Sequence, residues 1–149
     1  MRLSDGVQLD HVNLEVTDLD RARKFYDRFL TVLGFPRIPS DDPDWLGYRK
    51  GRMALWITVS RPARVARGPP HVPTDGVRDP ISDHIAFRAP SPERVVAIEK
   101  ALRHRGFMPV YSTDKLAAHG PTWYTSNAWK DPDNNVLEIY SVTKRRVER

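Results

Sequence analysis

Apolar and polar residues alternate from Leu9 to Val16, a pattern that predicts a strand with one apolar face. His11 and Asn13 lie on its polar face. In the segment that follows, apolar residues recur at intervals of three and four, which predicts an amphipathic helix. Asp18 can cap its first turn, and Gly34 stands where a left-handed C-terminal residue is expected. The apolar stripe of this helix consists of Leu19, Ala22, Phe25, Tyr26, Phe29 and Leu33.

Two further strands are predicted from Leu46 to Arg49 and from Met53 to Val59, around a turn at Lys50-Gly51. The segment from Arg61 to Pro80 is rich in proline and glycine. Proline removes a backbone donor and disfavours helix at the preceding residue. We therefore predict a linker or flap there, with little regular structure.

The second half repeats this order. A strand is predicted from Asp83 to Ala89, then a helix capped by Ser91, with Pro92 at its first position and Gly106 after its end. The helix stripe is Val95, Ile98 and Leu102. Three more strands follow, the last two flanking a turn over residues 131–135; they run from Met108 to Ser112, from Thr122 to Trp129 and from Val136 to Ser141.

Two local motifs recur at nearly the same interval. Asp10-His11 is echoed by Asp83-His84, and Gly34-Phe35 by Gly106-Phe107. A repeat held in register over such a distance predicts two equivalent modules. Each half is βαβ plus one or two further strands, so we expect an α+β fold whose mixed sheet curves around a shared cleft. One domain would span residues 1–149, with module one at about 7–60, a linker at about 61–80, module two at about 81–142 and a basic tail at 143–149.

Composition narrows the function classes. The chain has no cysteine, so disulfides, thiolate metal sites and cysteine nucleophiles are excluded. It shows neither a secretory h-region nor an apolar run long enough to span a membrane, so we expect a cytoplasmic protein without membrane association. The net charge is +5, concentrated in Arg61–Arg78 and in the tail. Such runs are either solvated or attract an anionic substrate; they are not interleaved with aromatic residues as in nucleic-acid-binding proteins.

Three residues form a candidate metal site. Glu138 lies on the last predicted strand between Leu137 and Ile139, so alternation directs it away from the apolar face. His84 begins the first strand of the second module, and His11 holds the equivalent place in the first. Each alone is more often a structural or solvated residue. Together, two imidazoles and one carboxylate with open positions match a facial site for a divalent metal.

The chain resembles the vicinal oxygen chelate superfamily, which includes glyoxalase I, fosfomycin thiol transferases, extradiol dioxygenases, methylmalonyl-CoA epimerase and bleomycin-binding proteins. The resemblance covers most of residues 7–142, and its matching stretches are LDHVNLEVTDLDRARKFYDRFLTVLGF, SDHIAFRAPSPERVVAIEKALRHRGF and KDPDNNVLEIYS. It implies tandem βαβββ modules that form a curved mixed sheet, a half-barrel around a metal-binding cleft. It also implies a homodimer and one divalent metal (Fe, Mn, Ni, Co or Zn) on His11, His84 and Glu138. The two modules that make a site could come from one chain or from two.

Departures from the family pattern concern the residues around this triad. Enzymes similar to glyoxalase I and to the epimerase use a fourth metal ligand, Glu or Gln, from the last strand of module one. The corresponding segment of this chain, Met53–Ile57, contains neither residue. Extradiol dioxygenases and the fosfomycin enzymes often place a Tyr ten residues before the final Glu. Here that position is Ala128, and Tyr124 is the expected substitute. Bleomycin-binding proteins lack the triad, which this chain retains.

The sequence offers several further candidate residues, and for some of them it leaves two interpretations open. His119 could act as a general acid or base at the cleft mouth, or be a surface loop residue. Asn13 and Ser126 have the parity to contact substrate. The aromatic residues Trp45, Tyr48 and Trp56 could wall a pocket for a planar substrate, or belong to the core.

We therefore predict a divalent-metal-dependent enzyme that chelates vicinal oxygens of a small, anionic or planar molecule, with dioxygenase-like or thiol-transferase/lyase-like chemistry. The alternatives are a drug-sequestering protein of the bleomycin-resistance type and an accessory component without catalysis.

Overall fold

The computed structural model describes residues 9–59, 84–112, 117–119 and 122–144. The chain folds as two compact units, residues 1–65 (unit 1) and residues 66–149 (unit 2). The predicted linker at 61–80 lies outside the described residues, as does the tail from residue 145.

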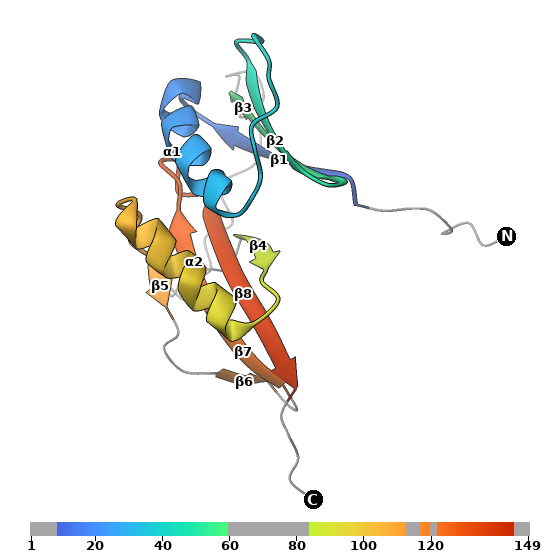
Figure 1. Ribbon diagram of the computed structural model, residues 1–149. Helices are drawn as coiled ribbons and strands as arrows, with labels where there is room; N and C mark the ends of the chain where they lie inside the picture. Colours follow the sequence, from blue (N-terminus) through green and yellow to red (C-terminus); the bar gives the residue numbers. More distant parts are fainter. Residues whose placement is uncertain (1–8, 60–83, 113–116, 120–121, 145–149) are drawn as a thin grey trace, which may run out of the picture. The chain divides into compact units, whose positions relative to one another are not determined.

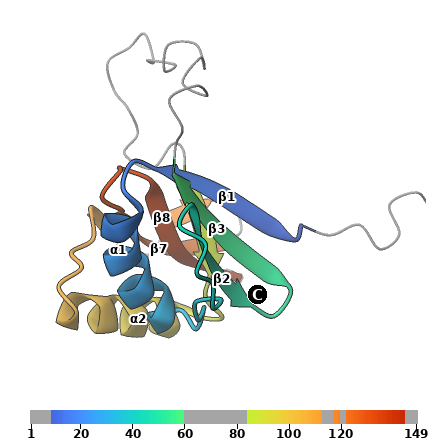
Figure 2. The ribbon, with the colours of Figure 1, turned by 90° about the horizontal axis from the view of Figure 1, so that it is seen from above.

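Unit 1 is a three-stranded mixed sheet with one helix (Figure 1). Its elements are β1 (His11–Val16), α1 (Leu19–Val32), β2 (Trp45–Lys50) and β3 (Met53–Val59). The strand order is β1-β3-β2, with β1 parallel and β2 antiparallel to β3. Helix α1 lies along one face of this sheet, as Figure 2 shows from a second direction.

Helix α1 begins and ends where the sequence predicts. The Asp18 side chain accepts a hydrogen bond from the backbone N–H of Arg21 at 2.9 Å, and Gly34 has a φ of 76° just after the helix. A positive φ carries little steric cost only for glycine, so the chain can turn there. The apolar stripe is buried at Leu19, Ala22, Tyr26, Phe29 and Leu30.

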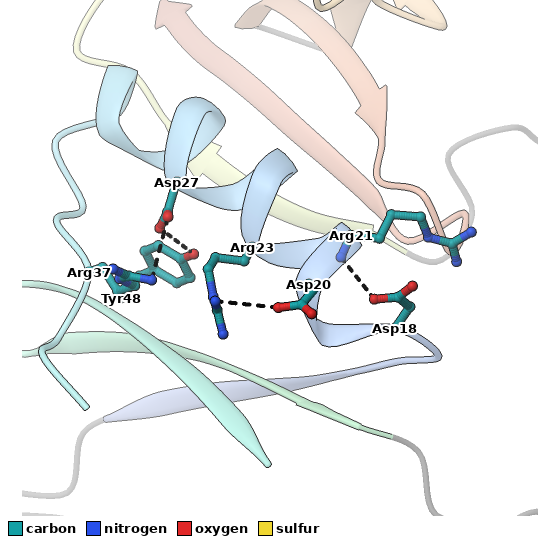
Figure 3. Close-up of polar contacts among 7 residues, drawn as sticks. All are labelled: Asp18, Asp20, Arg21, Arg23, Asp27, Arg37 and Tyr48. Carbon is teal, nitrogen blue, oxygen red and sulfur yellow. Dashed lines mark hydrogen bonds and ion pairs between the residues drawn. The ribbon is translucent and has the colours of Figure 1, made fainter. Parts of the chain in front are cut away.

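A polar cluster joins α1 to β2 on the helix-covered side of the sheet (Figure 3). The Tyr48 hydroxyl donates to Asp27 Oδ1 at 2.9 Å, and Arg37 Nη1 lies 3.5 Å from the other carboxylate oxygen. Burial raises the pKa of the Tyr48 hydroxyl, and the hydrogen bond to Asp27 raises it further. Tyr48 is a buried core residue and lies on the opposite face from Trp45 and Trp56, so the pocket-wall interpretation does not apply to it.

Unit 2 repeats the plan with more strands. Its elements are β4 (His84–Arg88), α2 (Pro92–His104), β5 (Tyr111–Ser112), β6 (Ala117–His119), β7 (Thr122–Lys130) and β8 (Val136–Lys144). The strand order is β4-β8-β7-β5, and β6 also pairs with β7. Strand β4 runs parallel to β8, β7 is antiparallel to it, and α2 packs on β7 and β8.

The predicted α+β class is confirmed: the structure has two mixed sheets, one in each unit, and two helices, and the other differences lie at strand ends. The strand predicted from Met108 to Ser112 shortens to two residues, and Pro109 offers no backbone donor just before it. Strand β6 was not predicted, and β8 continues beyond Ser141 to Lys144. Within the described residues, neither helix has the length and apolar content needed to cross a bilayer.

Candidate functional site

Glu138 is a buried carboxylate at the centre of the unit 2 sheet. It lies on β8 with only 1% of its surface exposed. Its cross-strand neighbours are Ala86 on β4 and Ala128 on β7. Burying a charge is costly unless hydrogen bonds or a cation compensate it. The partners of its two oxygens therefore decide what Glu138 can do.

The first oxygen, Oε1, accepts two hydrogen bonds from β7. The Tyr124 hydroxyl donates to it at 2.8 Å, and the Ser126 hydroxyl donates to it as well. Burial raises the pKa of Tyr124, and its hydrogen bond and proximity to Glu138 raise it further, so the phenol stays protonated and remains a donor. A hydrogen bond to a charged group contributes about 1.5–3 kcal/mol. The carboxylate plane is thus held from one side.

The second oxygen, Oε2, faces a histidine. His84 Nε2 lies 3.0 Å from it, within ion-pair distance. Even so, Oε2 is buried and accepts no properly aligned hydrogen bond from any described residue. Nitrogen and oxygen ligands lie about 2.0–2.2 Å from a divalent cation such as zinc. Two adjacent ligands of an octahedral site, at a right angle to each other, are then about 3 Å apart. The spacing and the orphaned oxygen fit a shared divalent cation.

A tight turn sets the register that creates this arrangement. Asp131 Oδ1 accepts hydrogen bonds at 2.8 Å from the backbone N–H groups of Asp133 and Asn135, and Asn134 has a φ of 68°. Asparagine tolerates this left-handed conformation better than most residues. The turn pairs β7 with β8 so that Tyr124, Ser126 and Glu138 share one face.

Two more residues on this face were not among the predicted site residues. The Tyr140 ring stacks on that of Tyr124 with centroids 5.1 Å apart, which limits the positions open to the Tyr124 hydroxyl. Arg88 is exposed at the end of β4, in register with Tyr140. Strand alternation could have identified both residues from the sequence. Each lies an even number of residues from a predicted metal ligand on its own strand and therefore shares a face with it.

In unit 1, His11, Asn13, Trp45 and Trp56 lie on the sheet face opposite α1. His11 is half exposed, and its Nδ1 lies 2.9 Å from Asp10 Oδ2. The Asn13 amide donates to Thr58 Oγ1 at 3.1 Å.

The indoles of Trp45 and Trp56 on this face meet edge to face with their ring centroids 4.9 Å apart, and the Trp56 ring covers Gly47. This face has no Glu or Gln on β3, because its β3 residues are Ala54, Trp56 and Thr58.

Among the predicted site residues, the structure brings His84, Glu138, Tyr124 and Ser126 together in unit 2. Within the described part of the chain, no three His, Cys, Asp or Glu side chains converge as a metal cluster. The predicted assignment of His11 to the same metal stays a prediction. His119 ends β6 opposite Thr122, and its side chain lies outside the described set.

Comparisons with known proteins agree with this architecture. The family model described as Glyoxalase/Bleomycin resistance protein/Dioxygenase superfamily matches residues 8–139. A candidate glyoxalase from Bacillus halodurans superposes with a TM-score of 0.66 at 25% identity, covering 94% of this chain and 99% of that chain. A glyoxalase/bleomycin resistance protein from Albidiferax ferrireducens T118 gives 0.61 at 24% identity, covering 89% and 98%. A lactoylglutathione lyase from Agrobacterium tumefaciens gives 0.62 at 18% identity, covering 91% and 93%. A search of curated proteins finds no significant match.

Proposed function

The chain belongs to the glyoxalase/bleomycin resistance protein/dioxygenase superfamily, and from that premise we propose that it is a divalent-metal-dependent enzyme acting on a small molecule with vicinal oxygens. One observation carries the proposal. In unit 2 an imidazole nitrogen and a buried carboxylate oxygen lie 3.0 Å apart, and that oxygen receives no hydrogen bond from the described residues. A hydrogen-bonded structural pair would align the N–H with the oxygen.

The residues around the pair have separate roles. His84 and Glu138 would hold the metal, and the family resemblance adds His11 as a ligand. When bound, the metal supplies a Lewis acid that polarises the substrate's oxygens. Tyr124 and Ser126 hold Oε1 of Glu138 and so direct Oε2 toward the cation. Outer hydrogen bonds of this kind orient a ligating group and tune its affinity.

The proposed reaction class comes from the family, and the open positions of the metal site are compatible with it. The chain has no cysteine nucleophile, and the described unit 1 face offers no fourth carboxylate or amide ligand on β3. A site with two His and one carboxylate leaves several positions for substrate. We propose dioxygenase-like or thiol-transferase/lyase-like chemistry on that basis.

Metal stoichiometry tests this function. Untagged protein is loaded in turn with Fe²⁺, Mn²⁺, Ni²⁺, Co²⁺ and Zn²⁺, freed of excess metal and measured by mass spectrometry of the elements. We expect one metal ion per chain, lost in His84→Ala and in the isosteric Glu138→Gln, and reduced in His11→Ala. His104→Ala, at an exposed end of α2, is the matched control and should keep its metal. Wild-type protein without metal under every condition would contradict the proposal.

The second candidate function is sequestration of a planar compound without turnover. Trp45 and Trp56 favour it, because edge-to-face indoles on the sheet face opposite α1 can stack against a flat ring. Tight binding of such a compound, measured by tryptophan fluorescence and unchanged by a chelator, would support this alternative over the enzyme.

A further inference from the structure

Arg88 is a cation on the same sheet face as the two proposed metal ligands of unit 2. Side chains at i, i+2 and i+4 of a strand line one face, so His84, Ala86 and Arg88 lie in a row along β4. Ala86 is level with Glu138 on the neighbouring strand, and Arg88 is level with Tyr140. Arg88 therefore lies one pleat, about 7 Å, from the row of the buried carboxylate.

The charge of Arg88 is not compensated within the described part of the chain. Its side chain is exposed and makes no hydrogen bond or ion pair with any described residue. Other arginines do find carboxylates: Arg103 binds Glu99 at 2.7 Å, and Arg37 lies 3.5 Å from Asp27. A guanidinium left unpaired beside a ligand pair is available to an external anion.

The residue next to Arg88 on this face is small and exposed. Ala86, between His84 and Arg88, is exposed and has the shortest side chain after glycine. A side chain of this size does not separate the imidazole of His84 from the guanidinium of Arg88 along the strand. A guanidinium binds the two oxygens of a carboxylate through parallel N–H donors, which fixes orientation as well as adding affinity. A single arginine matches the single charge of a carboxylate. The chain's net charge of +5 favours the approach of such an anion.

We propose that Arg88 binds a carboxylate of the substrate, so that the substrate class is a small acid carrying vicinal oxygens. This inference rests on the proposed function, because the metal held by His84 and Glu138 takes those oxygens. Arg88 then decides which vicinal-oxygen compounds bind, and it positions them relative to the carboxylate row.

Calorimetric titration of the Zn²⁺-loaded protein tests this with two probes. Protocatechuate carries two adjacent hydroxyls and one carboxylate, whereas catechol carries the hydroxyls alone. Zn²⁺ is redox-inert and does not oxidise either probe. The wild type should bind protocatechuate about ten- to a hundredfold more tightly than catechol, the range expected of a charge-assisted hydrogen-bonded pair.

Three variants isolate the role of Arg88. In Arg88→Gln the preference for protocatechuate should vanish, while catechol affinity and zinc content stay at the wild-type level. Arg88→Lys keeps the charge without the planar fork and should recover part of the preference. Arg94→Gln, an exposed arginine on α2, removes the same charge elsewhere and should change neither affinity.

The outcomes separate the two proposals. Zinc and catechol binding without a preference for protocatechuate, or a preference that survives in Arg88→Gln, overturns the role of Arg88 and leaves the metal site intact. Absence of zinc binding in the wild type overturns the proposed function and this inference together.

Discussion

At the scale of single residues, the two oxygens of the Glu138 carboxylate have different environments. Oε1 accepts from two hydroxyls of β7, whereas among the described residues Oε2 faces the imidazole of His84 alone. If both oxygens had aligned donors, the residue would be a satisfied structural carboxylate. Because only Oε1 does, we propose that the hydroxyls of Tyr124 and Ser126 act through Glu138 by orienting Oε2.

Removing these donors should weaken metal binding without removing it. We predict that Tyr124→Phe and Ser126→Ala each lower zinc affinity about tenfold, as loss of an outer hydrogen bond to a ligand does. Competition with a chromophoric chelator measures the change. Ser141→Ala is the matched control. Like Ser126, Ser141 is buried, but it lies on β8, points to the other face of the sheet and makes no hydrogen bond with the described residues. Unchanged affinity in both variants would refute the role of the two hydroxyls.

Tyr48 provides a pH prediction of known sign. Its pKa is raised in the folded state above the value of about 10 expected when unfolded. Its contribution to stability is therefore complete below pH about 10 and is lost as the pH rises toward the folded-state pKa.

Tyr48→Phe should therefore cost about 1–3 kcal/mol at neutral pH, because Asp27 loses a donor. Its stability should also decline less than that of the wild type above pH about 10. Urea unfolding at several alkaline pH values measures both effects. Tyr111→Phe, at an exposed tyrosine, serves as the control. Equal alkaline decline in Tyr48→Phe and the wild type would contradict this account.

At the scale of elements, the paired strands β2 and β3 make one close side-chain contact, where a tryptophan ring lies over a glycine. A Cβ atom on Gly47 would lie 2.4 Å from the Trp56 ring and 3.0 Å from Ile38. The Trp56 indole can therefore lie over β2 only because position 47 has no side chain. This contact also presents Trp56 to the edge of Trp45.

We predict that Gly47→Ala displaces Trp56 and lowers the free energy of unfolding by about 1–3 kcal/mol, the usual cost of overpacking. Tryptophan fluorescence and near-ultraviolet circular dichroism should both change. Gly51→Asn is the matched glycine variant, because position 51 has a φ of 58°, which asparagine tolerates, and no neighbour within 4 Å. Unchanged fluorescence and circular dichroism spectra in Gly47→Ala would show that the Trp56 indole accommodates the added methyl group, and would contradict this prediction.

The elements themselves were largely predictable, because their signals are local. Caps at Asp18 and Ser91, positive φ at Gly34 and Gly106, and the apolar stripe of each helix all act within a few residues. Strands β5 and β6 were less predictable. Their extents depend on pairing with β7, which alternation along a single strand does not reveal.

At the scale of the whole molecule, we propose the homodimer that the family resemblance implies. Met108, Val110 and Tyr111 are exposed apolar side chains at and just before the edge strand β5. An unprotected apolar edge favours pairing with another chain, and lysine there opposes it.

Sedimentation equilibrium should give about twice the chain mass of 17.1 kDa for the wild type. Val110→Lys should shift the protein toward monomer. Val96→Lys, at an exposed apolar position on α2, should leave the mass unchanged. A monomeric wild type, or a dimer indifferent to Val110→Lys, would exclude this edge as the interface.

The sequence by itself determined the two βαβ-containing halves, the parity that places His84 and Glu138 on one face, and the family. These follow from periodicity, capping and motif spacing, which are properties of neighbours along the chain. Only the tertiary structure decided which donors meet the carboxylate. The residue directly opposite Glu138 is Ala128, and Tyr124, two pleats away, reaches it across the paired strands. Side-chain reach across a sheet depends on register, twist and rotamer together, and no single stretch of sequence contains all three.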